Sequence, residues 1–211
     1  MANFRNPDHS RPALGSWLAI FAIVFAWSAI NPVDRFTWWL EVLPALLGLA
    51  ALAFFYPRFR FTSLTAWLIL AHCVILIVGG HYTYAEVPLG DWLAELMNSE
   101  RNNYDKLGHL AQGFVPALIA RELFIRLDIV PRAGWRGFLA VCVALAISAF
   151  YELIEWWAAL LSGEGAEAFL GMQGYTWDTQ SDMAWALGGA IAALALLGRL
   201  QDRQVDALRI R

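Results

Sequence analysis

Residues 17–30 read W-L-A-I-F-A-I-V-F-A-W-S-A-I, and residues 45–55 read A-L-L-G-L-A-A-L-A-F-F. These stretches are apolar around the whole helix rather than along one stripe, which is typical of helices in lipid. Around them, 59% of the 211 residues are hydrophobic, only 16% are charged, and the mean hydropathy is +0.50. A soluble domain carries about 25% charged residues. The sequence therefore predicts an all-α, polytopic transmembrane helical bundle.

Six apolar segments are long enough to cross a bilayer, and each should be a helix because irregular backbone cannot face lipid. They are residues 14–30, 38–56, 62–80, 107–126, 135–161 and 180–198. We expect one membrane domain, 1–211, and no internal repeat. Its expected parts are a three-helix part (1–80), an outer loop (81–106), a second three-helix part (107–198) and a cytoplasmic tail (199–211). The first apolar stretch, preceded by Arg5 and Arg11, is interpreted as a retained anchor rather than a signal peptide.

Two connections are long. Within residues 81–106, the stretch 88–97 predicts a short amphipathic helix that lies on the outer leaflet or covers the bundle as a lid. Residues 162–178 are rich in glycine and predict a mobile or sharply folded cover.

The basic residues indicate an orientation. With the N-terminus in the cytoplasm, all but three of the 15 Lys and Arg residues fall on the cytoplasmic side, and the exceptions are Arg35, Arg101 and Lys106. Cytoplasmic loops carry an excess of Lys and Arg, so we expect both ends inside, N-in and C-in.

Composition also limits the partners. The formal charge of -3 is close to neutral and gives no sign of a nucleic-acid partner, so membrane lipid is the expected one. The 11 Trp residues suit the two membrane interfaces. Cys73 and Cys142 both lie inside apolar runs, so we expect neither a disulfide nor a cysteine-based metal site.

Ionisable residues gather at the expected outer ends of the last three spans. Asp105, His109 and Gln112 follow i, i+4, i+7 spacing and fall within a wedge of about 60° on one helix face. Glu152 and Glu155 share a face of the next span. At ~1.5 Å per residue these groups reach similar depths and can meet if the three helices are neighbours. The full candidate set is Asp105, Lys106, His109, Gln112, Glu152, Glu155, Asp178, Gln180 and Asp182.

Three interpretations of this set stay open. The first is a purely structural clamp, in which Lys106 and His109 pair with the acids. The second is a divalent cation site with Glu152, Glu155, His109 and Asp182 as ligands, joined by Asp178. The third is a pocket for an envelope lipid or lipid-linked head group, where Glu155 and His109 are the catalytic candidates for acid and base if the protein is an enzyme. Transport is least favoured, because few polar residues continue from Glu152 to the cytoplasmic side.

Polar residues outside the candidate set are expected to have structural roles or to contact lipid head groups. Arg121, Glu122 and Arg126 lie near the cytoplasmic end of their span, where snorkelling and contacts with lipid phosphates would suffice. His72 is expected to be a hydrogen-bonded core or channel-lining residue. One stripe of small residues predicts close helix packing in the last span: Ala184, Gly188 and Ala192.

Three stretches resemble a known family. They are N-Y-D-K-L-G-H-L-A-Q-G-F-V-P-A-L-I-A-R-E (103–122), S-A-F-Y-E-L-I-E-W-W-A-A (148–159) and Q-G-Y-T-W-D-T-Q-S-D-M (173–183). They are similar to the YjdF-type family of bacterial inner membrane proteins and, more distantly, to VanZ-like membrane proteins of the cell envelope. The resemblance covers roughly residues 100–198. It implies a multi-pass location in the bacterial inner membrane and a shared polar motif that falls on the candidate residues above, but no named activity.

Overall fold

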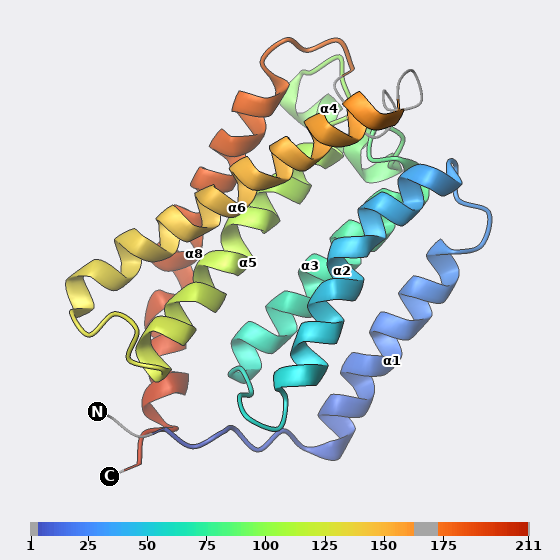
Figure 1. Ribbon diagram of the computed structural model, residues 1–211. Coiled ribbons are helices and arrows are strands. Elements are labelled where there is room, and N and C mark those ends of the chain that lie inside the picture. The colour runs from blue at the N-terminus through green and yellow to red at the C-terminus, as the bar shows by residue number, and fades with distance from the viewer. Residues whose placement is uncertain (1–3, 163–172, 211) are drawn as a thin grey trace.

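The computed structural model describes residues 4–162 and 173–210, and this part of the chain is helical (Figure 1). The described residues form seven helices, and their one β-type pairing is a bridge between Phe4 and Arg209. The all-α prediction is confirmed. The helices are α1 (Arg11–Ser28), α2 (Arg35–Phe55), α3 (Ser63–Tyr82), α4 (Pro88–Met97), α5 (Tyr104–Arg126), α6 (Ala133–Ser162) and α8 (Asp178–Asp206).

Local signals fix several helix ends. The Asp34 side chain accepts a hydrogen bond from the Thr37 N–H (2.6 Å) and caps the start of α2. Hydrogen bonds to this carboxylate, first from the Thr37 backbone and then from the Thr37 side chain, hold the pKa of Asp34 below its ordinary value. At the other end of α3, Thr83 has a left-handed backbone (φ 62°) and turns the chain out of the helix.

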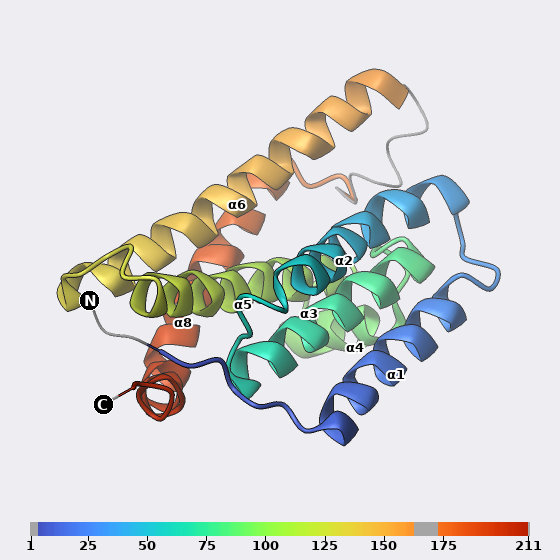
Figure 2. The same cartoon turned by 60° about the horizontal axis from the view of Figure 1, so that its bottom comes forward.

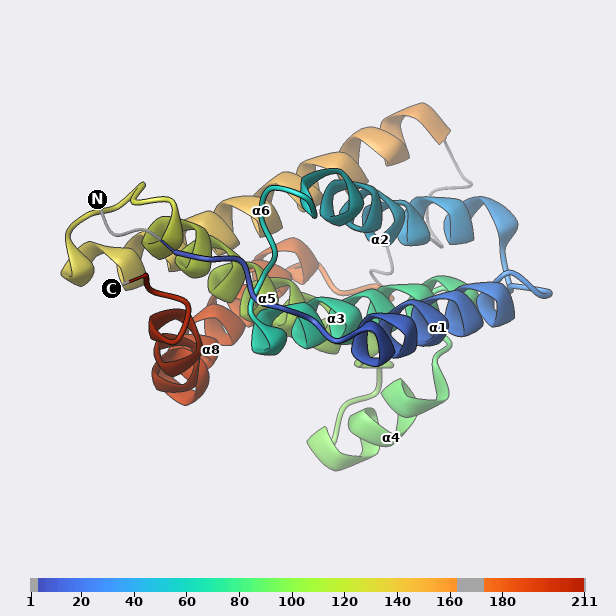
Figure 3. The same ribbon diagram turned by 90° about the horizontal axis from the view of Figure 1, so that it is seen from below.

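Helix α5 is the centre of the bundle. It packs against α8 and α6 on one side and against α3 on the other, while α1 and α2 both pack on α3. Figure 2 shows α6 and α1 on opposite sides of the α5–α3 pair. Figure 3 shows that α4 lies beside the long helices rather than among them. The three helices that carry the candidate site residues, α5, α6 and α8, are therefore neighbours.

Two glycines bring α5 and α8 together. A Cβ atom added at Gly113 would collide with the backbone of Ala186, and one added at Gly189 would collide with the backbone of Leu110. Gly188, by contrast, has open space around its Cα. The predicted stripe of Ala184, Gly188 and Ala192 is therefore wrong by about one residue. The buried small residues on α8 that face the bundle are Ala186, Gly189, Ala190 and Ala193.

Both chain ends lie at the same end of the bundle. The Arg5 N–H donates to the Leu208 carbonyl oxygen over 2.9 Å, and Figure 1 shows the two ends side by side. Helix α4 and the beginnings of α5 and α8 lie at the opposite end. The first is called the terminal end below, and the second is called the α4 end.

Five helices have the length and hydropathy of membrane spans, namely α1, α2, α3, α6 and α8. Their exteriors expose large apolar side chains, such as Leu196 on α8, as expected of surfaces in lipid. Helix α5 corresponds to the sixth predicted span, but it carries several charged residues and is not among the five helices with the hydropathy of a membrane span. The structure also extends α8 to Asp206, beyond the predicted end at residue 198.

The predicted short helix at residues 88–97 is present as α4. Most of the predicted glycine-rich cover, residues 163–172, lies outside the described residues.

Candidate functional site

An acidic cluster lies inside the α4 end of the bundle, where α5, α6 and α8 meet. Helical spacing puts Asp105 and His109 one turn apart on α5, and it puts Asp178 and Asp182 one turn apart on α8. The neighbouring α6 contributes Glu152. Most of these side chains are buried, and Asp105 is partly exposed. The members of the acidic cluster are Asp105, Lys106, His109, Glu152, Asp178 and Asp182.

His109 occupies the middle of this cluster. Its Nε2 atom lies 3.3 Å from Asp105 Oδ1 and 4.0 Å from Asp182 Oδ2. Its Nδ1 atom lies 3.0 Å from the Gln112 side-chain oxygen and 3.8 Å from Glu152 Oε1. One donor atom from each of Asp105, His109 and Asp182 fits within 4.8 Å of the others, a spacing that could hold a metal ion.

Lys106 neutralises the side of the cluster next to α8. Its Nζ atom donates to Asp178 Oδ1 over 3.0 Å and to Asp182 Oδ1, and it lies 3.8 Å from Asp105 Oδ2. Arg101 adds a second cation, with Nη1 2.7 Å from Asp178 Oδ1. Asp178 therefore contacts two positive groups, while the other carboxylates of the cluster are less well balanced.

Glu152 is the least satisfied member. Its side chain is 7% exposed, and its Oε1 atom has no hydrogen-bond partner among the described residues. A buried polar atom without a partner costs free energy, and such atoms are rare in folded proteins. Oε1 lies 3.8 Å from Nδ1 of His109, so this oxygen faces the cluster.

Two predicted site residues stand apart from these contacts. Glu155 is partly buried one turn from Glu152, and the described part of the chain offers it no hydrogen bond or ion pair. Gln180 is exposed on α8. The structure thus brings seven of the nine predicted residues into contact around His109 and Lys106 and leaves these two at the margin.

Sequence reasoning missed Glu41. This α2 residue is 5% exposed, and its Oε2 atom accepts a hydrogen bond from the Tyr151 hydroxyl (3.3 Å). The Tyr151 ring lies edge-on to His109, with 6.4 Å between ring centroids, so Glu41 extends the acidic cluster toward α2. A carboxylate within an apolar span was the signal that could have identified it.

The loop before α5 is fixed by Asn102. This buried side chain donates to the Val87 carbonyl oxygen (2.8 Å) and to Asp91 on α4 (2.7 Å). Its backbone exchanges two hydrogen bonds with the Gln173 side chain, so the chain just before α8 is tied to the same point. Beneath the loop, burial raises the pKa of the Tyr84 phenol well above its ordinary value and keeps the group neutral.

A second buried polar group, the inner network, lies toward the terminal end. Glu122 is fully buried and accepts hydrogen bonds from the Thr62 N–H and hydroxyl, the Thr65 hydroxyl and Arg126, at 2.6–2.8 Å. Gln201 on α8 completes the inner network through Thr65.

The expectation that Glu122 and Arg126 snorkel to the surface is therefore wrong. Both side chains point into the bundle, because the chain around Thr62 and the N-terminal segment cover the end of α5. Arg121 differs in detail, since it pairs with Asp202 over 2.7 Å near the surface. The expected hydrogen bond at His72 is also not seen within residues 4–162 and 173–210, where its buried Nε2 atom has no partner.

Comparison with known proteins agrees with the membrane architecture. The model of a family described as "Predicted membrane protein (DUF2238)" matches residues 13–203. The curated inner membrane protein YjdF of Escherichia coli (strain K12) is 49% identical over 183 residues, which cover 87% of this chain and 88% of that protein. No solved structure matches the chain.

These matches confirm the resemblance to YjdF-type proteins and extend it to nearly the whole chain. They do not support the more distant resemblance to VanZ-like proteins, which stays a prediction. Together with the apolar helices, they confirm a multi-pass protein of the inner membrane. The chain belongs to the DUF2238 family of predicted membrane proteins.

Proposed function

We propose that this membrane protein binds a divalent cation in the acidic cluster, at a site that faces away from the cytoplasm. The observation that carries the proposal is the approach of Asp105, His109 and Asp182, whose donor atoms fit within 4.8 Å of one another. The Oε1 atom of Glu152 supports it independently, because this oxygen is buried beside the same histidine and no donor among residues 4–162 and 173–210 reaches it.

The donor set suits a metal that accepts oxygen and imidazole ligands. Carboxylates with one imidazole suit Mn²⁺, Fe²⁺ or Zn²⁺, and carboxylates alone suit Mg²⁺ or Ca²⁺. Gln112 contacts Nδ1 of His109 and would orient the ring so that Nε2 faces Asp105 and Asp182. Metal binding at Nε2 requires the unprotonated nitrogen, so the proposed site releases a proton when it fills.

Charge balance supports a bound cation. Six carboxylates belong to the acidic cluster or lie at its margin, and two permanent cations, Lys106 and Arg101, contact this group. Buried carboxylates that lack a counter-charge are costly in a membrane, and a divalent ion would supply the missing positive charge. The carboxylates are Glu41, Asp105, Glu152, Glu155, Asp178 and Asp182.

The proposed orientation rests on six crossings with both ends in the cytoplasm. The first and last described segments both lie at the terminal end, joined by the hydrogen bond from Arg5 to Leu208, which fits an even number of crossings and supports α5 as a sixth span beside the five apolar helices. The excess of Lys and Arg at that end supports a cytoplasmic location for it. Reporter fusions after residue 100 and after residue 211 test this, with the first expected to report the periplasm and the second the cytoplasm.

A structural clamp is the second candidate, and Lys106 favours it. This buried ammonium group bridges Asp178 and Asp182 directly, as expected of a polar network that holds α5 against α8. The two candidates differ in what they predict for Asp105, which is needed for a cation site but contributes little to the Lys106 bridge. Binding of a lipid head group, or catalysis on a lipid-linked substrate with Glu155 and His109 as acid and base, stays a prediction.

Metal binding to purified protein tests the proposal. We expect Mn²⁺ or Zn²⁺ to raise the apparent unfolding midpoint in detergent and to bind with about one ion per chain by isothermal titration and elemental analysis. Asp105→Asn and His109→Gln should each abolish this effect, because each removes one ligand. Glu95→Gln is the matched control, since it removes an exposed carboxylate of α4 at the same end. No response to Mn²⁺, Zn²⁺, Mg²⁺ or Ca²⁺ in the unmodified protein would refute the cation proposal and favour the clamp.

A further inference from the structure

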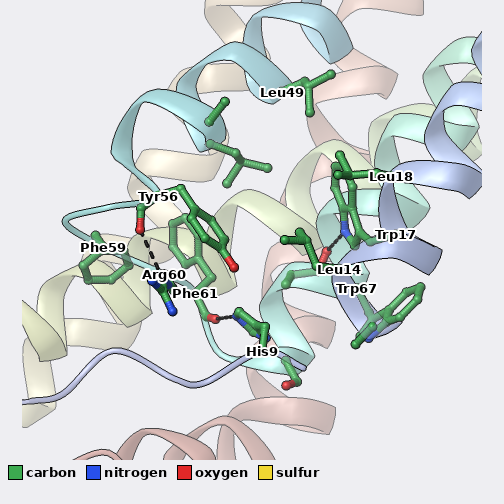
Figure 4. Close-up of a pocket in the computed structure, with 15 residues that line it drawn as sticks. His9, Leu14, Trp17, Leu18, Leu49, Tyr56, Phe59, Arg60, Phe61 and Trp67 are labelled. Atoms are coloured by element: carbon green, nitrogen blue, oxygen red, sulfur yellow. Dashed lines mark hydrogen bonds between the residues drawn. The ribbon is translucent and has the colours of Figure 1, made fainter. Parts of the chain in front are cut away.

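A cavity of about 350 Å³ opens between α1, α2 and α3 near the terminal end (Figure 4). Helices α1 and α2 each pack on α3 and touch each other near the α4 end, where the Trp38 indole of α2 contacts Ser28 and Phe25 of α1. Toward the terminal end they diverge, and side chains line the gap between them. Cavities of ~300–1,000 Å³ are typical of sites that bind small ligands. This cavity is separate from the acidic cluster, which lies among α5, α6 and α8.

Most of the cavity wall is apolar and belongs to α1, α2 and α3, and His9, whose Nε2 atom lies 2.9 Å from the Phe61 carbonyl oxygen, is a polar exception near the terminal end. Trp17 is held in the wall by its Nε1–H, which donates to the Ala66 carbonyl oxygen (2.9 Å). The rim is also apolar, since Leu18 and Trp67 are both substantially exposed. An apolar opening on this surface faces lipid chains rather than water. The main wall residues are Leu14, Trp17, Leu18, Leu49, Leu52 and Trp67.

One end of the cavity is basic. Arg60 lies in the turn between α2 and α3, where its guanidinium group is 4.6 Å from the centroid of the Tyr56 ring and its Nε–H donates to the Tyr56 carbonyl oxygen. Its backbone is held from both sides, by Asn6 and by Arg126. Figure 4 shows Arg60, Tyr56 and Phe59 on one side of the cavity and Trp17 and Leu18 on the other.

Arg60 is therefore positioned but not neutralised. Within residues 4–162 and 173–210, no acidic group pairs with it, and its two terminal nitrogens make no hydrogen bond. Two parallel N–H groups of a guanidinium match the oxygens of a phosphate, and such charge-assisted pairs are among the stronger hydrogen bonds in proteins. The apolar walls and the free guanidinium thus call for a ligand that has both a hydrocarbon chain and a phosphate.

We propose that this cavity binds one anionic phospholipid from the leaflet at the terminal end, with an acyl chain between α1 and α2 and the phosphate on Arg60. The chain accounts for the apolar walls, and the phosphate accounts for the unpaired charge at the interface. A second cation, Arg58, lies in the same turn but does not line the cavity, and its guanidinium lies over the exposed Phe54 ring. This pair of arginines provides a direct comparison.

Native mass spectrometry of the purified full-length protein with phosphatidylglycerol tests the proposal. Arg60→Ala should weaken binding by about tenfold, as expected for the loss of a charge-assisted contact. Ala53→Trp should also weaken binding, because Ala53 lines the cavity and a large ring there fills it. Arg58→Ala is the matched control and should bind like the unmodified protein. Far-ultraviolet circular dichroism confirms that each variant is folded.

Further titrations identify the part of the lipid that is recognised. Phosphatidylcholine should bind more weakly than phosphatidylglycerol, and glycerol phosphate, which lacks acyl chains, should not compete. Competition by glycerol phosphate would mean a simple phosphate site and would overturn the proposal. Equal binding by Arg60→Ala and Arg58→Ala, or unchanged binding by Ala53→Trp, would overturn it as well.

Discussion

Removal of the Glu122 carboxylate should destabilise the bundle more than any surface change at the same end. Glu122 is fully buried and accepts four hydrogen bonds, and its partner Arg126 is also buried. Breaking a buried ion pair from one side costs about 3–5 kcal/mol, because the remaining charge is left uncompensated. We therefore expect Glu122→Ala to lower the free energy of unfolding by about that amount.

The assay is unfolding by sodium dodecyl sulfate in mixed micelles, followed by circular dichroism. Asp206→Ala is the control, because it removes the exposed pair with Arg209 (3.5 Å) and should cost about 0.5 kcal/mol or less. The double variant Glu122→Leu with Arg126→Met should lose less stability than Glu122→Ala, since it leaves no unpaired charge. A loss for Glu122→Ala no larger than that for Asp206→Ala would refute the reasoning.

Three further changes give specific outcomes in the same unfolding assay. Gly113→Ala and Gly189→Ala should each lower the free energy of unfolding by about 1–3 kcal/mol, because the added methyl group pushes α5 away from α8. Gly188→Ala has space for its Cβ atom and should be neutral or slightly stabilising. Lys106→Met should cost about 3–5 kcal/mol at neutral pH by leaving Asp178 and Asp182 facing each other, and Lys106→Arg should restore part of the loss. Asp34→Ala should cost about 1 kcal/mol at pH 7. Folding lowers the pKa of Asp34, so the contribution of Asp34 to folding stability is fully present above the unfolded pKa of about 3.9. This contribution is lost as the pH falls through the folded pKa. The stability difference between Asp34→Ala and the unmodified protein should therefore shrink in that pH range.

The spans and α4 were predictable because their signals are local. Continuous apolar stretches need no knowledge of neighbours to be read as helices in lipid, and the amphipathic stretch that begins at Pro88 matched α4 at both ends. The candidate site was largely predictable for a similar reason. Helical spacing fixed which residues of α5 share a face, and only the adjacency of α5, α6 and α8 had to come from the structure.

Other features depend on packing that one sequence does not reveal. Gly188 and Gly189 are adjacent and differ by about 100° around α8, so composition alone could not say which one contacts α5. Glu41 could have been noticed as a carboxylate in an apolar span, but nothing in the sequence of α2 indicates that Tyr151 of α6 reaches it. The burial of Glu122 likewise depends on Thr62 and Thr65, which come from a different part of the chain.

The two polar groups along α5 differ in how well the charges of their carboxylates are balanced, and this difference indicates where a ligand is best sought. In the inner network, both carboxylate oxygens of Glu122 accept hydrogen bonds and Arg126 balances the charge, as expected of a polar core that fixes helix positions. In the acidic cluster, carboxylates outnumber permanent cations, and an oxygen of Glu152 has no hydrogen-bond partner in the part of the chain that the structure describes. If the acidic cluster only held helices together, a hydroxyl or amide that donated a hydrogen bond to Glu152 would make it more stable. Local rules of this kind are broken mainly where function requires it. Arg126 Nε of the inner network also has no partner among the described residues, so the two groups differ in charge balance rather than in the number of buried atoms without a partner. The charge-deficient acidic cluster, rather than the charge-balanced inner network, is therefore where a ligand has to be sought.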